Sequence, residues 1–76
     1  MPAKQKLIRW GILGTGLIAA EFAKAMHHVR DAELVSVGSR TQSSANAFAE
    51  AHGLAHAHGS YEALAEDPQI DVVYIA

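Results

Sequence analysis

A glycine-rich turn directly after an apolar run constrains the fold of this chain more than any other feature. Residues 7–13 form the run, and the turn has the sequence Gly14-Thr15-Gly16-Leu17-Ile18-Ala19. This sequence fits the pattern G-x-G-x-x-G/A, which is typical of the passage from a first parallel strand to a first helix at a dinucleotide site. We therefore predict that the fold begins with a strand, a tight turn and a helix.

Each small residue of the turn has its own physical task. Gly14 permits the sharp exit from the strand, where a side chain would meet a steric cost. Gly16 lets a phosphate approach the backbone amides, and Ala19 is small enough for the helix to lie close to the strand. The N-terminus of that helix would direct unpaired N–H groups at the phosphate. The expected cofactor-binding residues here are Gly14, Thr15, Gly16, Leu17 and Ile18; a turn without a ligand is the alternative.

Strands and helices alternate along the rest of the chain. Further strands are predicted at 33–38, 54–57 and 70–76, and helices at about 17–28, between Thr41 and Gly53, and at 61–65. Thr41 and Ser60 are the expected N-caps, and Gly53 is the expected left-handed C-terminal residue. Strands that alternate with helices through short links imply right-handed crossovers and a parallel sheet, so we predict an α/β fold. It is a Rossmann-type parallel sheet in the order 3-2-1-4 with helices on both faces, an incomplete doubly wound domain.

Apolar spacing predicts which side chains are buried. The buried stripe expected on the first helix consists of Ile18, Phe22, Ala25 or Met26, and Val29. Trp10 and Tyr74 lie in predicted strands, so we expect them to pack in the core rather than to stack on a ligand.

The five histidines raise the question of a metal site. His27 and His28 are neighbours on a helix and point roughly 100° apart, which makes them a poor chelating pair. His56 and His58 share one face of an extended segment, a spacing that suits ligation in principle. Without a cysteine or a nearby carboxylate, we expect no metal site. The acidic residues predicted at the surface of turns and loops are Glu62, Glu66, Asp67 and Asp71, and no catalytic acid and base pair is expected.

Composition bounds the class of protein and its partners. Half of the 76 residues are hydrophobic and the net charge is −2, so the chain is predicted to be globular, with no basic surface for nucleic acid or anionic membrane. The absence of cysteine favours a cytoplasmic location. Residues 1–6 lack the order of a signal peptide, and no apolar run is long enough to span a bilayer.

The C-terminal residues bear on domain organisation. Val72, Val73, Tyr74 and Ile75 are typical of an interior strand, and such a strand at a sheet edge promotes self-pairing. We therefore expect the 76 residues to be the first part of a longer protein. A small domain that covers this edge by dimerising is the alternative. A homo-oligomer is expected.

Four stretches together resemble one family of oxidoreductases. They are residues 9–19, 37–40, 59–64 and 67–76. Over nearly its whole length the chain resembles the glucose–fructose oxidoreductase, inositol dehydrogenase and MocA (Gfo/Idh/MocA) family. The resemblance implies a nicotinamide-dependent oxidoreductase that acts on sugars, polyols or related alcohols. It also implies that residues 1–76 are the N-terminal part of an NAD(P)-binding Rossmann domain, and that the second, α+β domain for the small-molecule substrate is absent from this chain.

The same resemblance implies where the reactive groups lie. In the family the loop after the fourth strand contacts the nicotinamide half of the cofactor, and that loop is not part of this chain. Ile75, in the predicted fourth strand, is a further expected cofactor-binding residue. A Glu-Lys-Pro motif after the fifth strand supplies the catalytic lysine, and this chain has no such motif. Lys4, Lys6 and Lys24 stand before the first strand or on the first helix, so they cannot replace it. We expect the chain alone to be inactive.

The end of the second strand bears on the choice of cofactor. About 20 residues beyond the glycine turn, an acidic residue would bind the ribose hydroxyls of NAD, but this chain has Ser39 and Arg40 there. Asp31 and Glu33 precede the strand and lie at its other end. A guanidinium and a hydroxyl suit the 2′-phosphate of NADP. We therefore expect NADP to be preferred and NAD to be possible; an Arg40 in solvent or stacked on the adenine of NAD is the alternative.

Two other interpretations of the chain are also compatible with the glycine turn. One is a non-catalytic module that senses NAD(H) or CoA, and the other is a truncated Rossmann fragment with no activity of its own. The sequence after residue 76 distinguishes them. A Glu-Lys-Pro motif there favours the enzyme, and a channel, DNA-binding or ligase segment favours the module.

Overall fold

The structure, a computed structural model, describes residues 7–76. Residues 1–6, which include Lys4 and Lys6, lie outside the described residues. The elements in chain order are β1 (Ile8–Leu13), α1 (Leu17–Met26), β2 (Ala32–Gly38), α2 (Gln42–His52), β3 (His56–His58), α3 (Tyr61–Ala65) and β4 (Val72–Ile75). They alternate as the sequence predicts.

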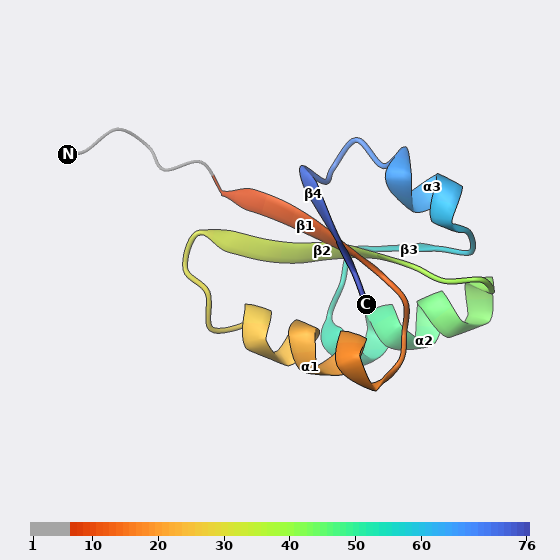
Figure 1. Cartoon of the computed structure of the whole chain (residues 1–76), viewed down its shortest axis with the longest axis horizontal. Coiled ribbons are helices and arrows are strands. Elements are labelled where there is room, and N and C mark those ends of the chain that lie inside the picture. Colours follow the sequence, from red (N-terminus) through yellow and green to blue (C-terminus); the bar gives the residue numbers. More distant parts are fainter. Residues whose placement is uncertain (1–6) are drawn as a thin grey trace.

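The strands form one parallel sheet in the order β3-β2-β1-β4. The predicted order is therefore confirmed. Ile12 in β1 lies between Val37 of β2 and Tyr74 of β4. Figure 1 shows α1 and α2 on one face of the sheet and α3 on the other, which confirms helices on both faces.

The main core lies between the sheet and the pair α1 and α2. Ile12 and Val37 in the central strands are fully buried, and so are Ala19 of α1 and Ala45 of α2. A separate contact holds α3 on the opposite face, where the fully buried Leu64 packs on the sheet.

Three aromatic rings extend the core toward β4. Phe22 of α1 stacks on Tyr74 with ring centroids 4.1 Å apart, and its centroid is 5.7 Å from that of Trp10. Both strand aromatics are half-buried against the core. The prediction that Trp10 and Tyr74 are packing residues is confirmed.

The predicted buried stripe of α1 is wrong in part. The helix turns Ala19, Ala23 and Met26 to the sheet, whereas Ile18 is 60% exposed and Val29, beyond the helix end, is 44% exposed. Alanine side chains allow the helix backbone to approach the strands closely. The larger Ile18 therefore lies on the flank of the helix, although its spacing fits a buried stripe.

The predicted caps of α2 and α3 are confirmed. Thr41 accepts a hydrogen bond from Ser44 N at 3.2 Å, and Ser60 accepts one from Ala63 N at 3.1 Å. Gly53 ends α2 with a left-handed φ of 73°. These short-range contacts are the part of the fold that neighbouring residues decide.

Several element ends differ from the predictions. Helix α1 ends at Met26 rather than near His28, and β2 begins at Ala32, one residue early. Strand β3 begins at His56 rather than at residue 54, because Leu54 N still donates to Ala49 O at the end of α2. Strand β4 is shorter than the predicted 70–76.

Within the described residues β4 is an edge strand that pairs with β1 alone. Val72 and Val73 are therefore partly exposed, at 38% and 37%, although their sequence is typical of an interior strand. Among the helices of residues 7–76, none has the length and apolar character that crossing a membrane requires.

Candidate nucleotide-binding site

A groove of about 610 Å³ opens at the carboxyl ends of the central strands. Its lining residues are Gly14, Thr15, Gly16, Ser39, Arg40, Thr41, Ser44 and Tyr61. Parallel strands place their carboxyl ends at one edge of the sheet, so the turns after β1 and β2 become neighbours. A hydrogen bond of 2.9 Å from Gly14 N to Gly38 O ties the two turns together.

Gly14 and Gly16 of the first turn have different physical reasons for the absence of a side chain. Gly14 has a φ of +115°, which L side chains rarely adopt, so the turn itself requires glycine. Gly16 has an extended backbone with φ −83°, which any residue can adopt. A Cβ on Gly16 would meet no atom within 4 Å, so the space beside it is open to a ligand.

The N-terminus of α1 lies at this groove without a side-chain cap. Its N-cap is Gly16, which provides no side-chain hydrogen bond, whereas Thr41 and Ser60 cap α2 and α3. The first N–H groups of a helix have no partner within the helix, and they suit an anion. The turn therefore fits the pyrophosphate of a dinucleotide, with Gly14, Thr15 and Gly16 as the residues that would hold it.

The other wall of the groove comes from the segment after β2. Ser39 is 8% exposed, and its N–H donates to His58 O at 3.0 Å, which fixes the start of this segment. Arg40 is exposed and is the one charged side chain among the described residues that line the groove. Asp31 precedes β2, as predicted, whereas Glu33 is the second residue of the strand; both lie at the end of β2 away from the groove. The wall therefore carries positive charge and no carboxylate.

The structure brings five of the eight predicted cofactor-binding residues to the groove: Gly14, Thr15, Gly16, Ser39 and Arg40. Leu17 and Ile18 begin α1, are 77% and 60% exposed, and do not line it. Ile75 lies at the carboxyl end of β4 opposite Leu13 and is 74% exposed. The roles of all eight residues in binding stay predictions.

Sequence reasoning missed three lining residues: Thr41, Ser44 and Tyr61. Thr41 was assigned only its capping role, which also draws Ser44 to it through a 2.9 Å hydrogen bond between the hydroxyls. Tyr61 follows β3, whose carboxyl end lies at the same edge of the sheet. That shared edge was the available signal for all three.

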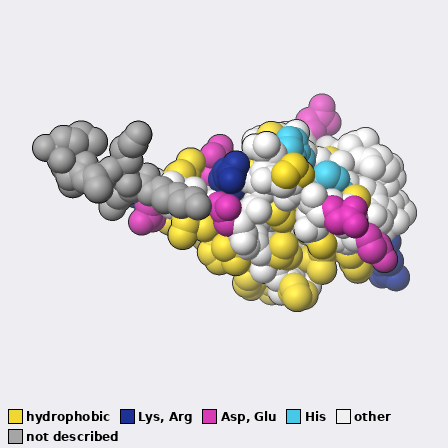
Figure 2. Space-filling view, turned by 90° about the horizontal axis from the view of Figure 1, so that it is seen from above, with side chains coloured by type: hydrophobic (Ala, Val, Ile, Leu, Met, Phe, Trp, Pro, Cys, Tyr) yellow, Lys and Arg dark blue, Asp and Glu magenta, His cyan; other side chains and the backbone are white. Residues whose placement is uncertain are grey.

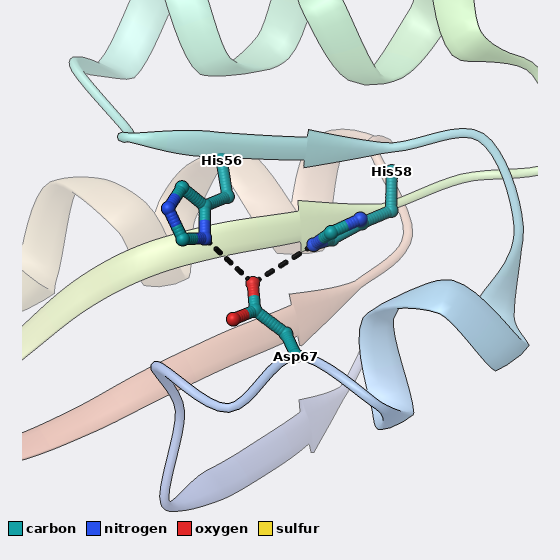
Figure 3. A group of neighbouring side chains, drawn as sticks. All are labelled: His56, His58 and Asp67. Carbon is teal, nitrogen blue, oxygen red and sulfur yellow. Dashed lines mark hydrogen bonds and ion pairs between the residues drawn. The ribbon is translucent and has the colours of Figure 1, made fainter.

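A second polar group lies outside this groove and corrects the prediction for Asp67. This residue is 6% exposed rather than at the surface. Its Oδ2 atom is 2.7 Å from His56 Nδ1 and 2.8 Å from His58 Nε2 (Figure 3). The same atom accepts a 3.0 Å hydrogen bond from Ser36 Oγ. The expectation that the histidines have no nearby carboxylate is therefore wrong.

The charge of Asp67 is set by two opposing effects. Burial raises the pKa of its carboxyl, while hydrogen bonds from His58, His56, the Gln69 N–H and Ser36 lower it. The hydrogen bonds outweigh burial and hold the pKa well below its usual value. Asp67 is thus a buried carboxylate that stays ionised at neutral pH.

A parallel sheet in the order 3-2-1-4, with a glycine turn and an uncapped helix N-terminus at the carboxyl end of β1, defines a Rossmann-type nucleotide-binding domain. Residues 8–76 match the family model described as "Oxidoreductase family, NAD-binding Rossmann fold". The chain belongs to the Gfo/Idh/MocA family of oxidoreductases.

Relatives of known activity are similar to this chain. It is 43% identical over 70 residues to the trans-1,2-dihydrobenzene-1,2-diol dehydrogenase of Danio rerio and 41% identical over 70 residues to that of Homo sapiens. Each match covers 90% of this chain, and the chain spans only 21% of the length of each relative.

Solved structures share the fold. A 3-ketoreductase from Actinomadura kijaniata in complex with NADP superposes with a TM-score of 0.81 and 31% identity, over 88% of this chain and 21% of that chain. The myo-inositol dehydrogenase from Lactobacillus casei in complex with NAD(H) and myo-inositol gives a TM-score of 0.80 at 24% identity, over 92% and 21%. At that identity the likeness concerns the fold alone.

Proposed function

We propose that this chain is the nucleotide-binding part of an NAD(P)-dependent oxidoreductase that acts on sugars, polyols or related alcohols. The observation that carries the proposal is the groove, where the turn after β1 leaves open space at Gly16 beside the uncapped start of α1. Family membership supports the redox chemistry. The dihydrodiol dehydrogenases support an alcohol as the substrate class, since a diol is oxidised at a carbinol carbon.

NADP is the proposed preferred cofactor, with NAD as a possible second one. Arg40 places a guanidinium in the groove, and no lining residue carries a carboxylate that would repel a 2′-phosphate. Ser39 adds a hydroxyl at the same wall. Related structures hold NADP in one case and NAD(H) in another, so the preference rests on these two side chains.

The proposal assigns substrate binding and the catalytic lysine to sequence outside these 76 residues. Lys24, the lysine among the described residues, is exposed on α1 and does not line the groove. We expect no turnover by this chain alone, which absorbance at the reduced-nicotinamide band with sugars and polyols would check.

A cytoplasmic homo-oligomer remains the expected state. A module that only senses the nucleotide is the second candidate, and the groove suits it equally.

Replacement of Gly16 tests the proposal. A Cβ at Gly16 would meet no atom within 4 Å, so Gly16→Val should keep the fold. It should abolish NADPH binding, because the new side chain occupies the place of the phosphate. Titration calorimetry measures the binding, and circular dichroism measures the fold. Ala51→Val, at an exposed alanine of α2 away from the groove, is the matched control. Equal NADPH affinity for the wild type and Gly16→Val would contradict the proposed binding site.

A further inference from the structure

The polar cluster of His56, His58 and Asp67 lies on the α3 side of the sheet and has no part in the nucleotide groove. Both imidazoles project from β3 toward the carboxylate, which comes from the segment between α3 and β4 (Figure 3). Histidine side chains reach the surface on this side of the molecule (Figure 2). The cluster therefore combines a buried anion with nitrogen ligands that solvent can reach.

We propose that His56, His58 and Asp67 bind a divalent transition-metal ion, with Zn²⁺ as the best fit. One ligand atom of each residue lies within 4.8 Å of the other two. Two imidazole nitrogens and one carboxylate oxygen are a ligand set that Zn²⁺ accepts in tetrahedral sites. Three protein ligands leave the fourth position to water or another small ligand.

The distances show what must change when the ion enters. Zinc bonds of 2.0–2.1 Å at tetrahedral angles separate neighbouring ligand atoms by roughly 3.3 Å. The present distances from Asp67 Oδ2 are 2.7 Å to His56 Nδ1 and 2.8 Å to His58 Nε2, so each must open by about half an ångström. The histidine side chains are 38% and 24% exposed, which leaves them room to move away from the fixed carboxylate.

Ion binding also requires a shift of protons that the cluster can make. A carboxylate only accepts hydrogen bonds, so the His56 Nδ1 and His58 Nε2 atoms beside it act as donors. An imidazole can carry its proton on either ring nitrogen, so the nitrogen that faces the carboxylate can become free to bind the ion.

Two further hydrogen bonds hold the carboxylate for this role. Ser36 Oγ donates to Asp67 Oδ2 at 3.0 Å, and Gln69 N donates to Oδ1 at 2.8 Å. Such outer contacts orient a ligand and raise metal affinity. A bound ion would join β3 to the segment before β4 by coordination, where hydrogen bonds join them now. The competing interpretation is that these hydrogen bonds are the whole role of the cluster.

Zinc titration distinguishes a metal site from a cluster that is only hydrogen-bonded. The 76-residue chain is first treated with a chelator, and the chelator is then removed. By calorimetry we expect one Zn²⁺ per chain in the wild type and a loss of affinity of about tenfold or more in His56→Gln and in His58→Gln. Ser36→Ala should weaken binding by about tenfold while every ligand remains. The matched control is the double variant His27→Gln, His28→Gln, which removes two exposed histidines outside the cluster and should bind as the wild type does.

Histidine ring resonances give a second measurement that needs no variant. One equivalent of Zn²⁺ should shift the His56 and His58 signals and leave those of His27, His28 and His52 in place. The absence of saturable binding by the wild type would overturn the proposal. So would equal affinity in His56→Gln, or resonance shifts at the other histidines instead.

Discussion

At the scale of the residue, two residues of the same kind that lie close together in the chain can have different surroundings and therefore different roles. Gly14 is required by its positive φ, whereas Gly16 has an ordinary backbone and an open space beside it. Asp67 and Glu66 are adjacent acids, yet Asp67 is buried among hydrogen-bond donors and Glu66 is exposed. Substitutions at this scale therefore separate the nucleotide groove from the histidine cluster.

Arg40 provides a test of cofactor preference. Arg40→Gln removes the positive charge from the groove, so it should weaken NADPH binding by roughly 1.5–3 kcal/mol, the size of a hydrogen bond to a charged group. NADH binding should change little, because NADH has no 2′-phosphate. Calorimetric titration with both cofactors measures the difference, and Arg30→Gln, an exposed arginine outside the groove, is the control. Equal losses for the two cofactors would point to adenine stacking instead.

Asp67 provides a test of the buried cluster as a source of stability. In chelated buffer at pH 7, Asp67→Asn should lower the free energy of unfolding by roughly 1.5–3 kcal/mol, because Ser36, His56 and His58 lose a charged acceptor. Urea unfolding followed by circular dichroism measures the loss. Glu66→Gln removes the exposed neighbouring charge and should change stability by less than about 0.5 kcal/mol.

The same variant reports the pH dependence of the cluster. The folded pKa of Asp67 lies below the 3.8 of the free group, so its contribution is present above about pH 3.8 and is lost as the pH falls further. Between about pH 5 and pH 2 the wild type should therefore lose more stability than Asp67→Asn. A parallel decline in both proteins would contradict the ionised, hydrogen-bonded carboxylate.

At the scale of the element, α1 shows how small residues choose the buried face of a helix. Spacing alone allows a stripe through Ile18 or one through Ala19, since the two faces lie roughly 100° apart. The helix buries Ala19 and Ala23, which allows its backbone to lie close to β2. The stabilising free energy comes from close packing of the helix backbone and the neighbouring side chains rather than from burial of the largest side chain.

A pair of leucine substitutions tests this orientation of α1. Ala23 is 1% exposed, so Ala23→Leu should overpack the contact with the sheet and destabilise the chain by roughly 1–3 kcal/mol. Ala25 is exposed on the same helix, and Ala25→Leu should be nearly neutral. Urea unfolding of both variants decides the matter. A larger loss of stability for Ala25→Leu than for Ala23→Leu would instead support the buried stripe predicted from the sequence.

At the scale of the whole molecule, β4 leaves an apolar edge on the described sheet. Val72, Val73 and Ile75 are all partly or largely exposed, and β4 has a neighbour on one side. An edge of this kind offers unpaired backbone groups to another chain. The proposed homo-oligomer and the proposed further sequence would both cover it.

Light scattering of the 76-residue chain measures whether the exposed β4 edge causes self-association. We expect the wild type to self-associate, and Val73→Lys to reduce the association because a charge at the edge opposes strand pairing. Ala47→Lys, at an exposed site of α2, is the control for added charge and should associate as the wild type does. A monodisperse wild-type monomer would contradict the expectation.

The sequence by itself determined the features that depend on residues close together in the chain. Local chemistry determines the glycine turn, the caps at Thr41 and Ser60 and the end of α2 at Gly53. The strand order is not a local feature, but the alternation of strands and helices and the Rossmann pattern of the glycine turn were enough to predict it. Tertiary structure alone decided the rest: the face that α1 buries, the entry of Tyr61 into the groove and the burial of Asp67 between two histidines. Each of these depends on how closely separate elements approach, and that distance is set by packing across the sheet.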